Sequence, residues 1–267
     1  MITVNDRKME IFKFPGGEIN VRVPHFIHSE IVTIKAFLKN SDDIMALLLT
    51  VDAIRRICCI EKLNLVLPYF PYGRQDRVCN YREAFSLSVM ANLINSLNFN
   101  RVTIYDPHSD VTPALIKNCN IIPLKDIFNQ FDPVSDLIFK NHILVVPDAG
   151  MIKKAHTISR LFQTELLCFK ERDLRTGNII DIGIYQPEKI TDNHLLVVDD
   201  ICDGGATFIK LAEKLRQYRP ASLSLYVTHG IFSKGLKGMK EAGINRFFTQ
   251  NGEVFENRDG LIVYEKH

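Results

Sequence analysis

Short, largely apolar runs recur along the chain, each bounded by polar or turn-forming residues. Such runs, apolar throughout rather than alternating, are typical of strands buried on both faces of a parallel sheet. The pattern predicts strands at 63–67, 102–105, 143–146, 165–169, 195–198 and 223–227, a shorter alternating strand from Ile19, and weaker strand patterns around Phe247 and Ile262. We expect the last two to be sheet edges or returns to the first half of the chain.

Between the predicted strands, apolar residues recur at helical spacing. One helix is predicted to begin at Ser41, with Asp42 and Asp43 in its first turn and a buried stripe that includes Leu47 and Val51. Other helices are predicted from the series Phe85, Val89, Leu93 and Leu97, from the segment between Lys153 and Leu161, and from Ile209, Leu211, Ala212 and Leu215.

Strands that alternate with helices indicate an α/β fold. A turn-forming stretch around Phe131 and Pro133 precedes a second strand and helix series that begins at Asn141. The sequence therefore predicts two domains, residues 1–135 and 136–267, which a chain of 267 residues is long enough to form.

Composition narrows the classes of function. The chain is 46% hydrophobic and has a formal net charge of +2, so no basic excess indicates nucleic acid as a partner. No apolar run reaches membrane-spanning length, and residues 1–10 lack the apolar core of a signal peptide, so we expect a soluble, cytoplasmic protein that binds no membrane. Six scattered cysteines without a Cys-x-x-Cys pair indicate reduced packing residues rather than disulfides or a zinc site.

The most distinctive stretch is 195–208, where a predicted strand leads through a loop into a predicted helix. Asp199 and Asp200 stand at the strand end, and Asp203, two glycines and Thr207 follow. Backbone N–H groups at a helix start bind anions, and glycines let a phosphate approach closely. Carboxylates accept hydrogen bonds from ribose hydroxyls or coordinate a metal, so the inferred ligand is a ribose 5-phosphate moiety. Helix capping alone would explain Asp203 but not the pair.

A second candidate site is the segment 68–77, Pro-Tyr-Phe-Pro-Tyr-Gly-Arg-Gln-Asp-Arg, which follows the predicted strand 63–67. Ligands of open α/β sheets bind at such strand ends. Arg74 and Arg77 flank an amide and a carboxylate in a loop stiffened by two prolines, an arrangement suited to polyphosphate oxygens. The alternative is that both arginines form surface salt bridges around Asp76.

Further polar groups follow other predicted strands. His108 stands between two aspartates after the strand 102–105, and Asp148 follows the strand 143–146. A histidine there suits a position near magnesium or phosphate, although a lone histidine is more often structural, and Asp148 is equally well explained as a helix cap. The charged segment 170–178 is either a solvated loop or a lid that closes over a nucleotide.

These segments together resemble one enzyme family. The stretch 195–208 resembles the ribose-phosphate loop shared by type I phosphoribosyltransferases and ribose-phosphate diphosphokinases (PRPP synthetases). The string at 68–77 resembles the ATP-binding loop of the second family, and the first family lacks it. The resemblance covers nearly the whole chain. It implies two related phosphoribosyltransferase-like (type I) domains, each a mainly parallel sheet flanked by helices, with ATP and ribose phosphate meeting in the cleft between them.

The resemblance gives each candidate residue a role. It makes the segment 170–178 a catalytic lid that carries Lys170 and Arg172, and it places magnesium at His108 and Asp148. It implies that ATP is bound by Phe14, Glu18, Arg74, Gln75, Arg77 and His108. It implies that the ribose phosphate is bound by Asp199, Asp200, Asp203, Gly204, Gly205, Ala206 and Thr207. His229, in the string Thr-His-Gly-Ile-Phe-Ser, is expected to be structural.

The implied reaction is Mg²⁺-dependent transfer of the β,γ-diphosphate of ATP to the anomeric hydroxyl of a 5-phosphorylated ribose, with release of AMP, in nucleotide biosynthesis. Such a transfer needs alignment and charge neutralisation more than covalent catalysis. Similar enzymes are homo-oligomers that share the ATP site, and we expect the same here. The alternatives are a type I phosphoribosyltransferase and a non-catalytic regulatory subunit similar to PRPP synthetase.

Two positions depart from the family. Gly16 replaces an acidic residue in the turn that offers Phe14 and Glu18 to adenine, and Gly204 replaces a threonine in the phosphate loop. Gly204 supplies one hydroxyl donor fewer and leaves more room. We therefore hypothesise that the site accepts a ribose whose 5-phosphate is further esterified, such as ADP-ribose, with ribose 5-phosphate as the default acceptor.

Overall fold

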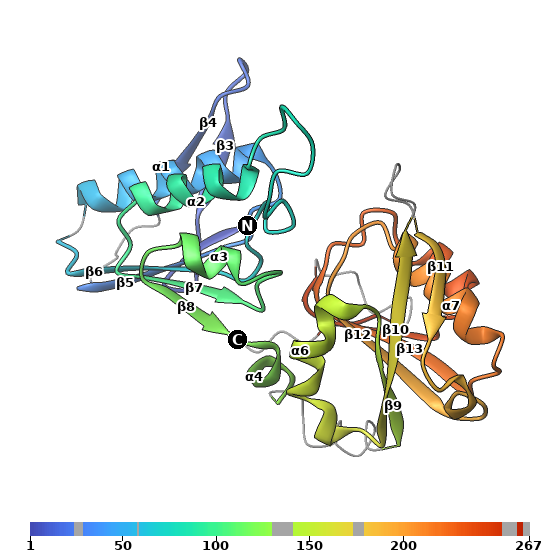
Figure 1. The fold of residues 1–267 in the computed structure, drawn as a ribbon. Helices are drawn as coiled ribbons and strands as arrows, with labels where there is room; N and C mark the ends of the chain where they lie inside the picture. The colour runs from blue at the N-terminus through green and yellow to red at the C-terminus, as the bar shows by residue number, and fades with distance from the viewer. Residues whose placement is uncertain (24–28, 58, 130–140, 173–178, 253–260, 264–267) are drawn as a thin grey trace. The chain divides into compact units, whose positions relative to one another are not determined.

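The computed structural model describes residues 1–23, 29–57, 59–129, 141–172, 179–252 and 261–263. The chain forms two compact units, Met1–Pro123 and Leu124–His267 (Figure 1). The junction expected near Phe131 lies outside the described residues.

In its described residues, the first unit contains a six-stranded sheet with the order β2-β1-β5-β6-β7-β8. Strands β5 to β8 are parallel to one another, whereas β1 is antiparallel to both β2 and β5. The strands are β1 (Ile2–Val4), β2 (Arg7–Lys8), β5 (Ile31–Ala36), β6 (Lys62–Leu67), β7 (Arg101–Tyr105) and β8 (Cys119–Ile122), and the short helix α3 (Val111–Leu115) precedes β8.

Helices α1 (Ser41–Ile57) and α2 (Ser86–Ser96) share one core with the alternate, buried residues of β5, β6 and β7 (Figure 1). The predicted stripe of α1 is confirmed, since Leu47 and Val51 are buried. The helix predicted from the series that contains Val89 is confirmed as α2, although Val89 itself is 66% exposed. Two apolar series share this helix, and the sheet buries the one formed by Leu87, Met90, Ala91 and Ile94.

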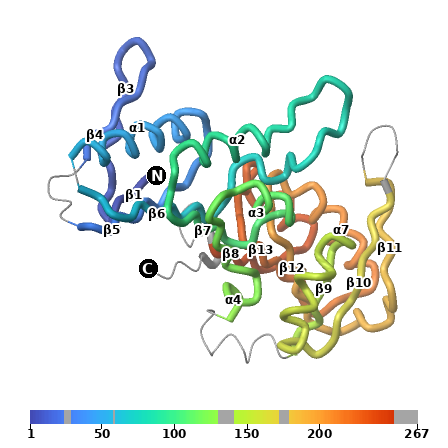
Figure 2. Tube along the Cα trace, turned by 60° about the vertical axis from the view of Figure 1, so that its left-hand side comes forward, coloured from blue at the N-terminus to red at the C-terminus, as the bar shows by residue number. Residues whose placement is uncertain are grey.

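A separate hairpin of β3 (Glu10–Lys13) and β4 (Ile19–Arg22) belongs to the first unit. Strand β4 packs against α1, and Ile19 and Val21 lie half-buried against the core. Figures 1 and 2 show the turn between the two strands projecting away from the rest of the unit.

In its described residues, the second unit contains a seven-stranded sheet with the order β11-β10-β9-β12-β13-β14-β15. Neighbouring strands are parallel except β10 and β11, which are antiparallel. The strands are β9 (His142–Val146), β10 (Thr164–Arg172), β11 (Ile179–Ile184), β12 (His194–Cys202), β13 (Ser222–Gly230), β14 (Arg246–Gly252) and β15 (Leu261–Val263).

Both faces of β12 are covered by helices. Leu195 and Val197 pack in the core that contains α7 (Ala206–Arg216) and α8 (Lys237–Glu241). Their neighbours Leu196 and Val198 pack in the opposite core with α4 (Leu124–Phe128) and α6 (Ile152–His156). Every residue of β12 after His194 is buried, which accounts for the unbroken apolar run from which the strand was predicted.

Three elements of the second unit differ from the prediction. The helix expected to reach Leu161 is broken into α6 and two 3₁₀ turns, Ala149–Met151 and Ser159–Leu161. Strand β10 continues to Arg172, because pairing with β11 satisfies its backbone, so the loop expected from Lys170 is shorter. Strands β14 and β15 extend the second sheet, with β15 at its edge, and do not return to the first.

Two mainly parallel sheets flanked by helices confirm the predicted fold class. No helix in the described ranges is both long enough and apolar enough to cross a bilayer.

Candidate active site

Three adjacent strands of the second unit, β9, β10 and β12, carry most of its predicted site residues. Asp148 follows β9, Lys170 lies near the end of β10, and Asp199 and Asp200 lie in the last part of β12. Because these ends meet at one edge of the sheet, they form the kind of edge where open α/β sheets bind ligands. The four side chains interact there through an ion pair, a hydrogen bond and their charges.

Asp148 and Lys170 form an ion pair. Lys170 Nζ lies 2.5 Å from Asp148 Oδ2, and the lysine side chain is 8% exposed against 32% for the aspartate. The other oxygen, Oδ1, accepts a hydrogen bond from the N–H of Met151 at 3.2 Å. Asp148 therefore does cap the 3₁₀ turn after β9, but only one of its oxygens serves the cap.

The aspartate pair on β12 is buried, since Asp199 and Asp200 are 9% and 5% exposed. Asp200 Oδ2 lies 3.3 Å from Nζ of Lys154, and the N–H of Asp200 donates to Asp199 Oδ1 at 2.9 Å. Burial, together with the charges of Asp200 and Asp148, raises the pKa of Asp199 well above its usual value. The folded protein thus favours a proton on Asp199 unless a cation or hydrogen-bond donors compensate its charge.

The turn between β12 and α7 is short. The strand continues through the aspartate pair to Cys202, so the pair lies within the strand rather than in the loop after it. Asp203 and Gly204 follow, and Gly205 is the N-cap of α7, with φ of +75°. A Cβ on Gly205 would lie 2.9 Å from Sδ of Met239, so both conformation and packing require glycine. Because the N-cap has no side chain, the first-turn N–H groups of α7 receive no cap from it, as an anion site needs.

In the first unit, the segment 68–77 follows β6 and His108 follows β7, an adjacent parallel strand. Asp76 is 9% exposed and accepts a hydrogen bond from Nε of Arg77 at 3.0 Å. Burial raises the pKa of Asp76, but the hydrogen bond from Arg77 and the charge of His108 help to outweigh it, so that pKa lies below its usual value. His108 therefore lies beside this loop, and Arg77 forms a salt bridge with Asp76.

A tight turn shapes the same loop. Tyr72 adopts φ of 61°, and the N–H of Gly73 donates to the carbonyl oxygen of Phe70 at 3.2 Å. A Cβ on Gly73 would approach that oxygen to 3.0 Å, so the turn favours glycine. Arg74 and Gln75 follow directly, and their side chains are exposed.

The predicted adenine turn closes the projecting hairpin of the first unit (Figure 2). The N–H of Phe14 donates to the carbonyl oxygen of Glu18 at 2.8 Å, and the N–H of Gly17 donates to that of Phe14 at 2.9 Å. The ring of Phe14 meets Phe12 edge-on, at 5.4 Å between centroids, and remains 47% exposed. Phe14 and Glu18 thus lie together at an exposed tip.

Part of the predicted lid is a strand. Lys170 belongs to β10, and the backbone of Arg172 pairs with Ile179 of β11. The rest of the predicted lid, residues 173–178, lies outside the described residues.

The predicted magnesium ligands, His108 and Asp148, belong to different units. Among the described residues, no three His, Cys, Asp or Glu side chains gather closely enough to enclose a metal ion. Mg²⁺ rarely uses such an enclosure, since it is held by one or two carboxylates together with substrate phosphates and water. The carboxylate of Asp148, which is one-third exposed, suits that mode of binding.

Two lysines at this edge were not among the predicted site residues. Lys154 pairs with Asp200, and Lys234 lies against Gly204. A signal for Lys154 exists in the sequence, because it stands on the short helix that directly follows the 3₁₀ turn capped by Asp148. Nothing in the sequence pattern links Lys234 to Gly204, since another strand and helix separate them.

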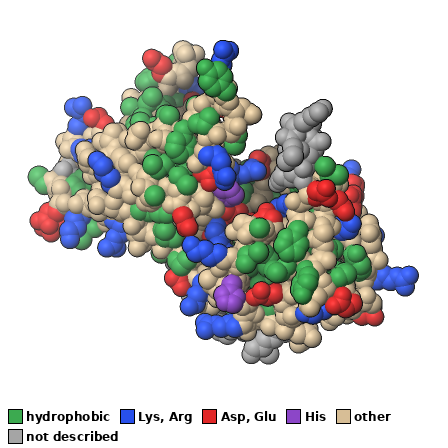
Figure 3. Space-filling view, in the orientation of Figure 1, with side chains coloured by type: hydrophobic (Ala, Val, Ile, Leu, Met, Phe, Trp, Pro, Cys, Tyr) green, Lys and Arg blue, Asp and Glu red, His purple; other side chains and the backbone are tan. Residues whose placement is uncertain are grey.

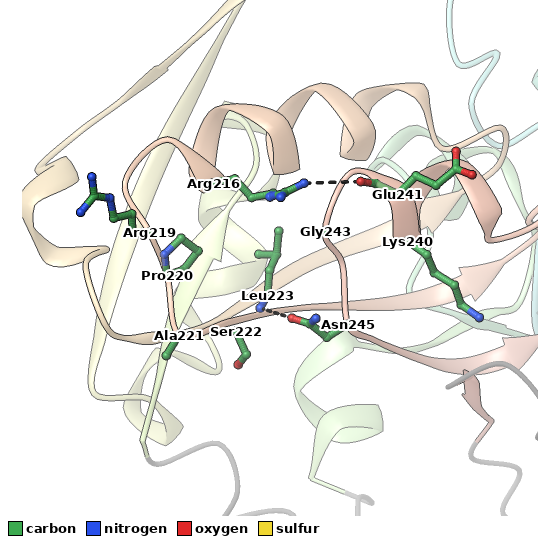
Figure 4. A pocket seen from close by; sticks show the side chains of 10 residues that line it. All are labelled: Arg216, Arg219, Pro220, Ala221, Ser222, Leu223, Lys240, Glu241, Gly243 and Asn245. Atoms are coloured by element: carbon green, nitrogen blue, oxygen red, sulfur yellow. Dashed lines mark hydrogen bonds between the residues drawn. The ribbon is translucent and has the colours of Figure 1, made fainter.

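A cavity of about 400 Å³ lies at the opposite edge of the second sheet, where β13 and β14 begin (Figure 4). Two of its three basic residues, Arg216 and Lys240, occupy the last turns of α7 and α8, where cations stabilise the negative ends of helices. Arg216 Nη1 donates to the carbonyl oxygen of Glu241 at 3.4 Å. No predicted site residue lines this cavity, so the candidate active site lies at the other edge.

Comparison with known proteins shows which family the chain is similar to. Residues 1–97 match a family model for the N-terminal domain of ribose phosphate pyrophosphokinase. A ribose-phosphate pyrophosphokinase of Maricaulis maris (strain MCS10) is 30% identical, across 85% of this chain and 73% of that protein. The protein of the same name from Buchnera aphidicola subsp. Schizaphis graminum (strain Sg) is 29% identical, across 97% of this chain and 82% of that protein.

A solved structure shares the fold. The crystal structure of phosphoribosylpyrophosphate synthetase from Mycobacterium smegmatis superposes with a TM-score of 0.78 at 20% identity, covering 96% of this chain and 85% of that one. The sequence matches extend over most of both chains and include the strand ends described above. The chain therefore belongs to the ribose-phosphate pyrophosphokinase family and is a diphosphotransferase.

Proposed function

We propose that this enzyme catalyses the Mg²⁺-dependent transfer of the β,γ-diphosphate of ATP to the anomeric hydroxyl of ribose 5-phosphate, with release of AMP. The observation that carries the proposal is the end of β12, where two buried aspartates precede a glycine turn and a helix start without a side-chain cap. A sugar phosphate requires groups that accept hydrogen bonds from its hydroxyls, next to a site that binds its phosphate.

In the proposed mechanism, the second unit holds the acceptor. Asp199 and Asp200 accept hydrogen bonds from ribose hydroxyls. These hydrogen bonds stabilise the negative charge of Asp199, which burial and the neighbouring carboxylates disfavour. The turn 203–207 binds the 5-phosphate. Lys154 holds Asp200 in place through their ion pair. Lys170 and Arg172 stabilise negative charge that develops on the transferred diphosphate.

The first unit binds ATP in this proposal. Arg74, Gln75, Arg77 and His108 contact the nucleotide, and the hydrogen bond from Arg77 to Asp76 restricts the orientation of that guanidinium group. Because guanidinium groups form paired hydrogen bonds to phosphate oxygens, two of them suit a polyphosphate chain.

Magnesium in this proposal is held by Asp148 and His108. When bound with ATP, the ion neutralises phosphate charge and makes the phosphorus open to attack. Asp148 can serve it because its carboxylate is one-third exposed, whereas Asp199 and Asp200 are buried.

Two acceptors are to be distinguished, ribose 5-phosphate and a 5-substituted ribose such as ADP-ribose. The hypothesis of a 5-substituted acceptor depended on the room left by Gly204. In the structure, the side chain of Lys234 lies in that space, 3.5 Å from where a Cβ of residue 204 would stand. This contact favours ribose 5-phosphate.

We also propose a homo-oligomer in which Phe14 and Glu18 contact the adenine of ATP bound to another copy, since both stand at an exposed hairpin tip. Ile152, Phe169 and Tyr185, on or beside α6, β10 and β11, are 40%, 49% and 59% exposed. Figure 3 shows hydrophobic side chains gathered on this part of the second unit. Exposed apolar groups of this kind are commonly covered by another protein surface. Light scattering after gel filtration tests this, and a monomer at the concentration of the assay would contradict it.

The reaction is tested by incubating the enzyme with ATP, MgCl₂ and ribose 5-phosphate or ADP-ribose, without a nucleobase. We expect AMP and a 1-diphosphorylated ribose in equal amounts by chromatography and ³¹P NMR, a higher kcat/KM for ribose 5-phosphate, and no product in EDTA. ADP as the nucleotide product would refute diphosphoryl transfer. Consumption of a 1-diphosphorylated ribose only when a nucleobase is added would identify a phosphoribosyltransferase.

The regulatory-subunit alternative is tested with Arg172→Ala, against Arg160→Ala as a control on an exposed arginine of the same unit. We expect the first change to reduce kcat by about 100-fold or more, as for other groups that stabilise transition-state charge, and the second to leave it unchanged. Equal activity of both variants would refute the role of Arg172. Absence of turnover in the wild-type protein would favour a regulatory subunit.

A further inference from the structure

The segment that follows β13 lies against the turn that precedes α7. The carbonyl oxygen of Cys202 accepts hydrogen bonds from the N–H groups of Ile231 and Phe232 at 2.8 and 3.1 Å. Ser233 Oγ donates to Asp203 Oδ1 at 2.6 Å. These three bonds fix residues 231–233 beside the turn, so the residue that comes next, Lys234, reaches the turn from a defined position.

Lys234 occupies the space that a side chain at position 204 would need. A Cβ on Gly204 would stand 3.5 Å from Cδ and 3.6 Å from Cε of Lys234. Since a C–N bond is about 1.5 Å long, the ammonium nitrogen lies within about 5 Å of that position. A single Cβ would fit, but the branches of a larger side chain would displace the lysine.

The ammonium group of Lys234 differs from those of its neighbours. Lys154 and Lys170 are paired with Asp200 and Asp148. For Lys234, which is exposed, the structure shows no ion pair or hydrogen bond among the described residues. A cation therefore stands near the turn before α7 with no ion-pair partner among the residues that the structure describes.

We propose that Lys234 is a substrate-binding residue whose ammonium group binds the 5-phosphate of the acceptor and makes the enzyme select a phosphate monoester. The inference rests on the proposed function, because it takes the turn 203–207 as the phosphate site. It assigns to Lys234 a role that compensates for the missing hydroxyl at Gly204.

Charge is the physical basis of this selection. A phosphate monoester carries a charge of about −1.5 to −2 near pH 7, whereas a phosphate esterified on both sides keeps a single negative charge. A nearby ammonium group therefore attracts the monoester more strongly. The lysine stem beside Gly204 also fills space into which a larger 5-substituent would otherwise extend.

The test compares Lys234→Met, which keeps the apolar stem and removes the charge, with Lys234→Arg, which keeps the charge. Lys237→Met is the matched control, because Lys237 lies on α8 with 88% of its side chain exposed. For Lys234→Met we expect KM for ribose 5-phosphate to rise about 10-fold, with KM for ATP and kcat within about twofold, as for the loss of one charge-assisted hydrogen bond. We expect Lys234→Arg to restore most of the affinity, and Lys237→Met to behave as wild type.

The same variants are assayed with ADP-ribose, and ribose 5-phosphate binding is also measured by calorimetry without ATP. We expect Lys234→Met to reduce the preference for ribose 5-phosphate over ADP-ribose by about the same factor. An unchanged KM and unchanged binding in Lys234→Met, or an equal rise in KM for ATP, would overturn the role of Lys234. If the wild-type enzyme binds ribose 5-phosphate but does not turn it over, the proposed reaction fails and the binding data still decide about Lys234. If the wild type does not bind it at all, both proposals fail.

Discussion

Replacing Lys170 by methionine tests the central charge arrangement of the second unit. The change keeps the length of the side chain and removes an ammonium group that is 8% exposed and 2.5 Å from Asp148. The carboxylate of Asp148 then loses its partner while it remains near Asp199 and Asp200. The negative charges of Asp148 and Asp200 both raise the pKa of Asp199, whereas Lys170 lowers it. Loss of the lysine therefore leaves the charges of Asp148 and Asp199 without the cation that balances them.

The expected loss of unfolding free energy follows from the exposure of the two partners. Removing one partner of a fully buried ion pair costs about 3–5 kcal/mol of unfolding free energy. Asp148 is 32% exposed, so water recovers part of its solvation, and we expect a loss of about 2 kcal/mol. In a Lys170→Met and Asp148→Asn double variant, the two losses should overlap, with a coupling of about 1–2 kcal/mol.

Urea unfolding followed by far-UV circular dichroism measures these quantities, since the chain contains no tryptophan. The measurement is made in EDTA, because Asp148 is a proposed magnesium ligand. Lys189→Met serves as a control, because the ammonium group of Lys189 makes a long 3.5 Å contact with the hydroxyl of Thr164 and no ion pair with any described residue. If the two single losses add to the double loss within about 0.5 kcal/mol, the ion pair does not stabilise the fold and the reasoning is refuted.

Asp199→Asn is expected to raise stability at neutral pH in EDTA and to lower kcat/KM for the acceptor. Burial and neighbouring carboxylates raise the pKa of Asp199, so the stability of the wild type falls as pH rises from the ordinary carboxyl pKa towards the raised pKa. Thermal melts across this pH range should show the fall in the wild type and not in the D199N variant. Gly243→Ala is expected to cost about 1–3 kcal/mol in urea unfolding, since Gly243 has φ of +105° and a Cβ there would overlap the neighbouring arginine side chain; an unchanged midpoint would contradict this. Cys59 and Cys79 are exposed, whereas burial raises the pKa of Cys168 to about 12, so mass spectrometry after brief iodoacetamide treatment at pH 8 should find the first two alkylated and Cys168 unmodified.

The elements predicted correctly are those for which the sequence pattern allows one structure. An unbroken apolar run such as 195–198 fits only a strand covered on both faces, and β12 is such a strand. Polar residues that end parallel strands must lie at the ligand-binding edge of the sheet, so the pattern of apolar runs is enough to place Asp148 and the aspartate pair at that edge. Their roles in catalysis remain predictions.

What could not be predicted depends on contacts between distant segments. The sheet determines which residues of α2 are buried, so the apolar spacing that predicts this helix does not reveal that Val89 is exposed. The end of β10 is set by its pairing with β11, and a charged sequence does not reveal that partner. Lys234 comes to Gly204 through hydrogen bonds to the carbonyl of Cys202, which no local pattern encodes.

Because every residue of β12 after the first is buried, we expect substitutions to be tolerated less well on this strand than on the surface connections of the enzyme. Its aspartates sit on a strand that cannot shift without disturbing cores on both sides, so variation there endangers the whole unit. Gly204 and Lys234 lie on surface connections outside both cores, where exchanges between side chains carry little structural risk. New acceptor preferences are therefore expected to arise at those connections, while the sugar-binding strand stays constant.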